Sequence, residues 1–350
     1  MYVREAVPDD NDELQKLQAQ CPMGTNLIVS TVNIPDFFVR AKAYESSRVF
    51  VACEDSQIIG SAACTMRDAV VNGEMSRVGY EFQAFVSPEH RRMGVARLLH
   101  QHMEDYLNEQ DVALSFVIIM EGNLPSMSLV EGQGFKRHRT LAMAMLAVYR
   151  MMDVPPGGKI RPATYEDLAA IAELLNSTWQ GHDLYEPTSA EALARFIDRT
   201  PAYSLDSLLV LEDRGNILAC LGFWDWSQIM RVTVEALSVR LRMIALMADI
   251  TRHVMPTPRV PKAGTTIKQW CLSPIGFKDP DHLSALFRYI NNQALQRGAD
   301  QIFCICEGEH ALLRGTKGFF RTDVGLHLYV KPLRSMSVGN NPVFVGGIDL

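Results

Sequence analysis

Residues 78–96 read VGYEFQAFVSPEHRRMGVA, and this stretch predicts a strand, a short basic turn and a helix in direct succession. Apolar residues alternate up to Ser87-Pro88, which is the period of a half-buried strand, and the proline ends it. After the turn, apolar side chains recur at steps of three and four residues, as on one face of an amphipathic helix. The members of this stripe are Val95, Leu98, Leu99, His102, Tyr106 and Leu107.

The turn between strand and helix has the properties of a phosphate-binding site. A backbone that leaves a strand and opens a helix directs several N–H groups outwards at the positive end of the helix dipole, where a diphosphate is the natural ligand. Gly94 and Ala96 are small enough to let phosphates approach, and Arg91 and Arg92 can pair with phosphate oxygens. An exposed basic helix start is the plain alternative. The strand before the turn and the periodic helix behind it favour phosphate binding.

The second half of the chain repeats the plan of the first. In each half an arginine-bearing strand precedes an acidic helix start, a hairpin follows, and an amphipathic helix leads into a buried strand. The matching segments are 3–17 with 160–175, 48–63 with 208–222, and 113–120 with 301–306. Because helices and strands alternate in both copies, the predicted fold class is α/β.

The chain of 350 residues is longer than a single core usually supports, so we expect two domains. Residues 153–159 hold two prolines and two glycines and separate the halves. We therefore predict an N-terminal domain at 1–150, a C-terminal domain at 159–332 and an extension at 333–350. The extension is rich in Ser, Gly and Asn, but its strand-like Val343-Phe344-Val345 indicates that it docks onto the body.

Net charge, apolar runs and the pattern of cysteines and histidines argue against several classes of protein. The net charge of -6 argues against a nucleic-acid binder. The sequence begins without an apolar signal core, and the longest apolar stretch, 141–152, is interrupted by Arg150 and too short for a bilayer span. Seven cysteines without a C-x-x-C pair indicate free thiols in a reducing compartment, and the histidines lack metal-ligand spacing. We expect a cytoplasmic monomer or homodimer with no metal, nucleic-acid or membrane partner.

At the basic turn the sequence resembles the GNAT acetyltransferase superfamily, whose hallmark is Q/R-x-x-G-x-G/A. Arg91-Arg92-Met93-Gly94-Val95-Ala96 satisfies that motif. Asn123, Ser126 and the pair Gly134-Phe135 resemble the family's N-x-x-A/S…G-F signature after the fifth strand. The resemblance implies an acetyl-CoA-dependent N-acetyltransferase.

The likeness is closer with the hookless-type N-acetyltransferases of plants. Residues 86–94 are similar to that family's V-S-P-x-H-R-R-x-G, and segments of the second half resemble it as well. Those segments are Phe223-Trp224-Asp225-Trp226, Arg231-Val232 and Val343-Phe344-Val345. This resemblance spans nearly the whole chain. It implies two tandem GNAT folds, each with a mixed central sheet flanked by helices, and no defined substrate.

The resemblance also implies roles for individual residues. Pantetheine amides would pair with the edge of the fourth strand at Ala84, Phe85 and Val86, where the fourth and fifth strands splay apart. The diphosphate would bind Arg91, Arg92, Met93, Gly94, Val95 and Ala96, and Asn123 with Ser126 would line the far wall. A neutral primary amine, on a small molecule or a protein, would attack the thioester directly.

The attacking amine must lose a proton. Family members often place a glutamate on the fourth strand, and counting back from Val86 reaches Glu81 and Tyr80. Glu81 is the better base, and a solvated strand carboxylate is the plain alternative. Val130 stands where many members carry the tyrosine that protonates the departing thiolate, so that acid is missing.

The second copy lacks the double arginine at its junction and carries Asp279 and Asp281 instead, which would repel a diphosphate. We interpret it as a degenerate GNAT domain. Two other functions stay open: a non-catalytic acyl-CoA-binding regulator, which the missing tyrosine favours, and an acyltransferase that uses a longer acyl-CoA.

Overall fold

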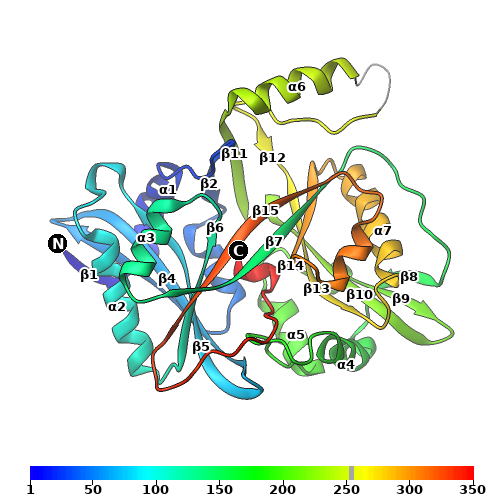
Figure 1. Ribbon diagram of the computed structural model, residues 1–350, viewed down its shortest axis with the longest axis horizontal. Helices are drawn as coiled ribbons and strands as arrows, with labels where there is room; N and C mark the ends of the chain where they lie inside the picture. The colour runs from blue at the N-terminus through cyan, green and yellow to red at the C-terminus, as the bar shows by residue number, and fades with distance from the viewer. Residues whose placement is uncertain (252–255) are drawn as a thin grey trace.

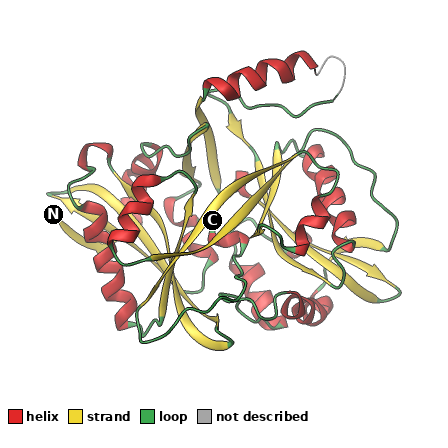
Figure 2. Ribbon diagram, viewed as in Figure 1, coloured by secondary structure: helices red, strands yellow, loops and turns green. Residues whose placement is uncertain are grey.

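The computed structural model describes residues 1–251 and 256–350, and its central feature is one long twisted sheet with helices on both faces (Figures 1 and 2). The first half contributes β1 (Tyr2–Glu5), α1 (Asn11–Ala19), β2 (Leu27–Asn33), β3 (Ser47–Glu54), β4 (Gln57–Val71), β5 (Glu74–Val86), α2 (Val95–Glu109), β6 (Leu114–Met120), α3 (Leu124–Gly132) and β7 (Lys136–Ala147).

The second half contributes a similar series of elements. They are β8 (Lys159–Pro162), α4 (Leu168–Thr178), α5 (Ala190–Arg199), β9 (Leu208–Asp213), β10 (Asn216–Asp225), β11 (Met230–Leu237), α6 (Val239–Thr251), β12 (Thr266–Ile267), β13 (Gln269–Phe277), α7 (His282–Gln296), β14 (Gln301–Glu307) and β15 (Arg321–Pro332). The predicted α/β class with a mixed sheet is confirmed.

The last strand of each half lies beside strands of the other half. The order in the large sheet is β1-β3-β4-β5-β6-β15-β7-β14-β13-β10-β9-β8. β15, from the end of the second half, pairs antiparallel with β6 and β7. β7, from the end of the first half, pairs antiparallel with both β15 and β14. Figure 1 shows these two strands crossing the middle of the molecule. This strand exchange joins the halves into one continuous sheet.

The repeat extends to individual side chains. Arg4 donates two hydrogen bonds to the carboxylate of Asp10, at 2.7 and 2.8 Å. Arg161 does the same to Asp167, at 2.6 and 2.9 Å. In both copies the carboxylate also accepts a backbone N–H from three residues earlier. Hydrogen bonds from the arginines lower the pKa of Asp10 and bring that of Asp167 to about 2. The same ion pair at the same place in each half supports an internal duplication.

Helices cover both faces of the first half's sheet, and β5 alternates between the two faces. Tyr80 and Phe82 of β5 share a core cluster with Leu14 and Leu17 of α1. Glu81, between them, points to the opposite face and contacts α2. α2 packs there over β3 and β4. Successive side chains of β5 therefore pack on opposite faces of the sheet, against different helices.

The C-terminal extension is docked onto the body, and its end lies near the centre of the molecule (Figure 1). Val343 is buried and forms a bridge with Asp183, whose carbonyl accepts the N–H of Phe344 at 2.8 Å. Asp349 is completely buried and accepts two hydrogen bonds from Arg67, at 2.7 and 3.0 Å. The expected docking is present in the structure.

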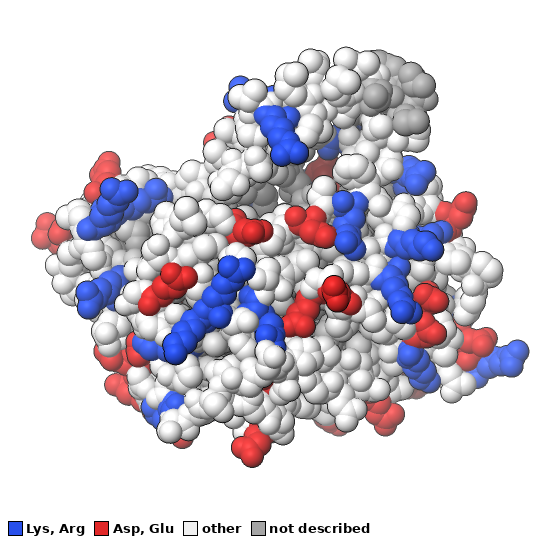
Figure 3. All heavy atoms as spheres, in the orientation of Figure 1, with Lys and Arg blue, Asp and Glu red and all other residues white. Residues whose placement is uncertain are grey.

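A smaller sheet of β12, β11 and β2 links the halves at one side, and α6 extends from it (Figure 1). The side chains of Val239, Met243, Leu246 and Ile250 on α6 are exposed. In the view of Figure 3, acidic and basic side chains are interspersed over the rest of this face. None of the helices in the described chain has the length and apolar character needed to cross a membrane.

Candidate functional site

β5 and β6 separate part-way along their length. They pair in parallel only from Val78 to Glu81 of β5 and from Leu114 to Val117 of β6. Past this point β6 continues against β15, and β5 continues against β4. In the order of the large sheet no strand lies between β5 and β6, so they form a fork that opens after Glu81 and Val117.

The edge of β5 inside the fork carries the residues predicted to pair with pantetheine. Gln83 has a φ of 50°, and the register with β4 shifts there, which marks a β-bulge. Phe85 and Val86 regain register with β4, whereas Ala84 is exposed and has no register partner. The Cys21 thiol donates to the Val86 carbonyl at 3.3 Å. A backbone edge with free hydrogen-bonding capacity can accept an amide-bearing chain in place of a strand.

The basic turn connects β5 to α2 in a conformation that exposes its N–H groups. Arg91 is extended, Arg92 has a φ of 65°, and Gly94, with a φ of 88°, immediately precedes the helix. No side chain caps α2. Within the described chain, no acceptor is present for the backbone N–H groups of residues 92–97. Unsatisfied N–H groups at a helix start form an anion site.

Positive charge surrounds these N–H groups. The side chains of Arg91, Arg92 and Arg97 are exposed, and none forms an ion pair with another described residue. A Cβ atom built at Gly94 meets nothing within 4 Å, so the space beside the turn is open. The positive φ of Gly94 is what favours glycine there, in addition to the predicted need for a small residue. Met93 is exposed, Val95 is buried and Ala96 is half-buried.

Asn123 and Ser126 lie at the other arm of the fork, where β6 leads into α3. The Asn123 Oδ1 accepts the backbone N–H of Ser126 at 3.4 Å and so caps α3. This hydrogen bond gives Asn123 a structural role at the start of the helix. The predicted wall residues are thus close to each other, on the side of the fork opposite the basic turn.

Glu81 is buried and both of its carboxylate oxygens have partners. Ser115 Oγ of β6 donates to Oε1 at 2.6 Å. His100 Nδ1 of α2 lies 2.6 Å from Oε2. The alternative of a solvated strand carboxylate is therefore wrong, because Glu81 is only 7% exposed.

His100 and Ser115 are not among the site residues predicted from the sequence. The predicted stripe of the helix includes Leu98 and His102, whereas the buried positions of α2 are Val95, Leu99, His100, Met103 and Leu107. Leu98 is 38% exposed, and the His102 ring packs edge-on against Phe50. The signal in the sequence for His100 is that this polar residue directly follows Leu99, at a position that an apolar stripe can include.

Tyr80 lies on the opposite face of β5 from Glu81. Its ring stacks on Phe82 and Phe116, and its hydroxyl donates to the backbone carbonyl of Asp349 in the docked extension. Burial raises the pKa of Tyr80. Tyr80 and Glu81, the two candidate catalytic residues, therefore lie on different faces of the sheet. The Tyr80 hydroxyl is already engaged in its hydrogen bond to Asp349.

Residues 12–135 match the model of the acetyltransferase (GNAT) family. The matched segment contains the fork between β5 and β6 and the basic turn. No curated protein sequence matches the chain.

Solved structures share the fold over nearly the whole chain. Saccharomyces cerevisiae N-myristoyltransferase with bound myristoyl-CoA is 12% identical, with a TM-score of 0.65 over 94% of this chain and 82% of that chain. A GCN5-related N-acetyltransferase from Sphaerobacter thermophilus is 13% identical, with a TM-score of 0.57 over 97% of both chains. One from Anabaena variabilis is 13% identical, with a TM-score of 0.55 over 95% of this chain and 72% of that chain. The predicted tandem GNAT architecture is confirmed.

The corresponding fork of the second half is closed by its own side chains. β13 and β14 pair in parallel from Gln269↔Gln301 to Cys271↔Phe303 and then separate, as β5 and β6 do. Beyond that point Trp179 Nε1 donates to the carbonyl of Ile275 at 2.8 Å. Thr178 Oγ1 accepts the N–H of Phe277 at 2.9 Å and donates to its carbonyl at 3.2 Å. The strand edge that is open in the first half is occupied here.

The turn before α7 also differs from the basic turn before α2. The Asp279 carboxylate accepts the backbone N–H of Asp281 at 2.9 Å. The chain therefore supplies its own anion at a position where a phosphate would otherwise bind. No cluster of His, Cys, Asp or Glu in the part of the chain that the structure describes is arranged to hold a metal ion.

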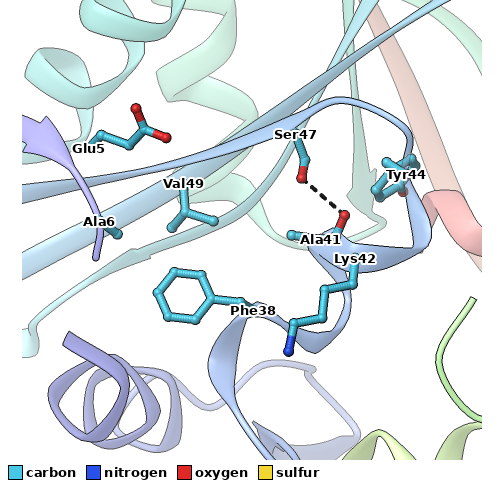
Figure 4. Close-up of a pocket in the computed structure, with 8 residues that line it drawn as sticks. All are labelled: Glu5, Ala6, Phe38, Ala41, Lys42, Tyr44, Ser47 and Val49. Atoms are coloured by element: carbon cyan, nitrogen blue, oxygen red, sulfur yellow. Dashed lines mark hydrogen bonds between the residues drawn. The ribbon is translucent and has the colours of Figure 1, made fainter. Parts of the chain in front are cut away.

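Two surface cavities lie away from the basic turn. One of about 200 Å³, shown in Figure 4, is lined by Glu5, Ala6, Phe38, Ala41, Lys42, Tyr44, Ser47 and Val49, with Ser47 Oγ donating to the Ala41 carbonyl. Another of about 440 Å³ lies between α1 and the β3–β4 turn and reaches Ser87. Neither cavity is lined by residues 91–96, and residues 91–94 of the basic turn are exposed.

Proposed function

We propose that the protein transfers an acetyl group from acetyl-CoA to a primary amine, in the manner of the hookless-type N-acetyltransferases. The observation that carries this proposal is the set of unpartnered N–H groups at residues 92–97, next to three unpaired arginines and the open fork. The anion site suits the diphosphate of CoA, and the free edge at Ala84 suits the amides of pantetheine.

The remaining assignments follow the same geometry. Residues 1–150 would form the acetyl-CoA-binding domain, 159–332 a degenerate GNAT-like domain, and 333–350 an extension. Asn123 and Ser126 would line the far arm of the fork, and Glu81 would contribute to removal of the amine proton. Release of CoA from acetyl-CoA in the presence of an amine library, with mass spectrometry of the products, tests the reaction. An absence of turnover with every amine would favour a non-catalytic acyl-CoA-binding regulator.

A longer acyl donor is the second candidate, and the fold shared with N-myristoyltransferase favours it. The diphosphate and pantetheine contacts are the same for any acyl chain, so they do not select acetyl-CoA. Comparing kcat/KM for acetyl-CoA and myristoyl-CoA with the same amine distinguishes the two donors. A higher value for myristoyl-CoA would overturn the acetyl assignment and leave the acyltransferase reaction in place.

We expect one CoA to bind per chain, in the first half. In the second half, Trp179 and Thr178 occupy the strand edge, and Asp279 caps the turn with a carboxylate. Both features compete with the groups that CoA would use. Calorimetric titration with CoA measures the stoichiometry. Two equivalent sites per chain would show that the second fork opens to the ligand.

A further inference from the structure

A buried histidine contacts the fork where its two arms begin to separate. Glu81 and Val117 are the last paired residues of β5 and β6. His100 Nδ1 lies 2.6 Å from the Glu81 carboxylate on one arm. The centroid of the His100 ring also lies 5.2 Å from that of Phe135, which shares an apolar cluster with Val117 of the other arm. The imidazole is only 5% exposed.

The contacts around Glu81 fix the tautomer of this histidine. Ser115 Oγ donates to Oε1, so Oε2 is left to accept the Nδ1–H of His100. The Nε2 atom of the neutral ring then carries a lone pair. That atom is buried and has no hydrogen-bond partner among the described residues. Buried polar atoms normally have a partner, so Nε2 is a free acceptor whose partner the described chain does not supply.

We propose that His100 carries the proton in the acyl transfer, with Glu81 and Ser115 as positioning residues. This inference rests on the proposed function. The amine nitrogen attacks the thioester carbon and its proton passes to Nε2. The C–S bond then breaks, and the imidazolium returns the same proton to the sulfur of CoA. Amine and acyl-CoA thus give amide and free CoA, with no net gain or loss of protons.

This arrangement accounts for the missing acid. Val130, which stands in place of the usual tyrosine, is buried among Val117, Ile119 and Phe135. Phe135 is also in contact with the His100 ring. Phe135 is therefore a neighbour of both Val130 and His100, and in this proposal one group serves as base and then as acid.

The charged groups around His100 support this role. Arg97 and Glu104 lie one turn away from His100 on α2, and Glu104 is paired with Lys331 of β15 at 2.6 Å. Cys64 of β4 faces Glu81 in the register of β4 with β5. Among the described residues, Glu81 is the carboxylate that contacts the imidazole directly. Its negative charge stabilises the imidazolium while the proton is in transit.

A purely structural network, which only ties α2 to β5 and β6, is the alternative. His100→Asn separates the two roles, because the asparagine amide can replace Nδ1–H as a donor to Glu81 but offers no base in place of Nε2. We expect its kcat to fall by about 10²–10⁴-fold with the amine found in the wild-type screen, and its affinity for CoA to stay within about threefold. His102→Asn is the matched control on the same helix, and its kcat should stay near wild type.

The outcomes separate the inference from the proposed function. Folded His100→Asn that binds CoA and retains kcat within about threefold of wild type overturns the inference alone. A wild type without turnover overturns the proposed function and the inference with it. The wild-type pH profile gives a second test, free of any folding defect: kcat should fall towards acid pH, because the transfer needs an unprotonated base. A profile without an acid limb contradicts the proposal.

Discussion

Replacing Arg91 and Arg92 together by glutamate is expected to weaken CoA binding by about 10²–10⁴-fold. Both side chains are exposed beside the N–H groups of the turn, and neither forms an ion pair within the described chain. Hydrogen bonds to charged groups contribute about 1.5–3 kcal/mol each, and about 1.4 kcal/mol corresponds to a tenfold change in affinity. Reversing the charges adds repulsion to the loss of these bonds. Calorimetric titration with CoA measures the effect.

A matched control separates the local effect from the change in net charge. Arg231→Glu together with Lys268→Glu changes the total charge by the same amount at exposed positions of the second half. CoA affinity in this control should stay within about twofold, because screening removes most of the interaction between distant exposed charges. Equal losses in the two double variants would contradict a phosphate site at the turn. Gly94→Glu is a less clear test, because its φ of 88° strains any side chain.

Replacing Glu81 by glutamine is expected to lower kcat by about 10²–10⁴-fold while CoA affinity stays near wild type. A glutamine has one acceptor oxygen and one donor nitrogen, so it cannot accept from both Ser115 and His100. With its oxygen bonded to Ser115, its nitrogen donates to His100 Nδ1 and forces the proton onto Nε2. The ring then presents a donor where a base is needed. A carboxylate-to-amide change of this kind costs about 10⁴-fold in Ser-His-Asp triads through the same change of tautomer.

Ser115→Ala is the comparison for Glu81→Gln. It removes one hydrogen bond to Glu81 but leaves the carboxylate able to accept the proton of His100 Nδ1. We therefore expect a loss of kcat of less than about tenfold, and an acid limb of the pH profile that persists. If Glu81→Gln retains kcat within about threefold of wild type at neutral pH, Glu81 is a structural carboxylate.

The basic turn could be predicted from the sequence because its determinants are local. A proline, a glycine and two arginines between a strand and a helix fix the backbone and the charge within a few residues. The His100–Glu81 contact could not be predicted in the same way, since it depends on the rotation of α2 about its axis. Leu99 is in both the predicted and the observed stripe, but His100 and Met103 are buried in place of the predicted Leu98 and His102, so a different side of the helix faces the sheet.

The strand exchange also left no signal in the sequence. Residues 321–332 have the alternating pattern of a strand wherever they pair, and the repeat indicates two self-contained copies. Whether β15 lies beside β14 or between β6 and β7 depends on contacts between residues far apart in the chain. The boundaries at 150 and 159 therefore describe the repeat along the sequence and stay a proposal for the domains.

The exchanged strands affect how this duplicated gene can evolve. After a duplication, a copy that loses its activity is usually free to be deleted. Here the second copy supplies β15, which lies in the sheet between β6 and β7, next to the fork. Deleting it would leave both of those strands with an unpaired edge, even if the copy binds no substrate of its own. Selection on the active copy would therefore retain the other as part of its scaffold, and mutations that disrupt β15 should impair catalysis from a distance.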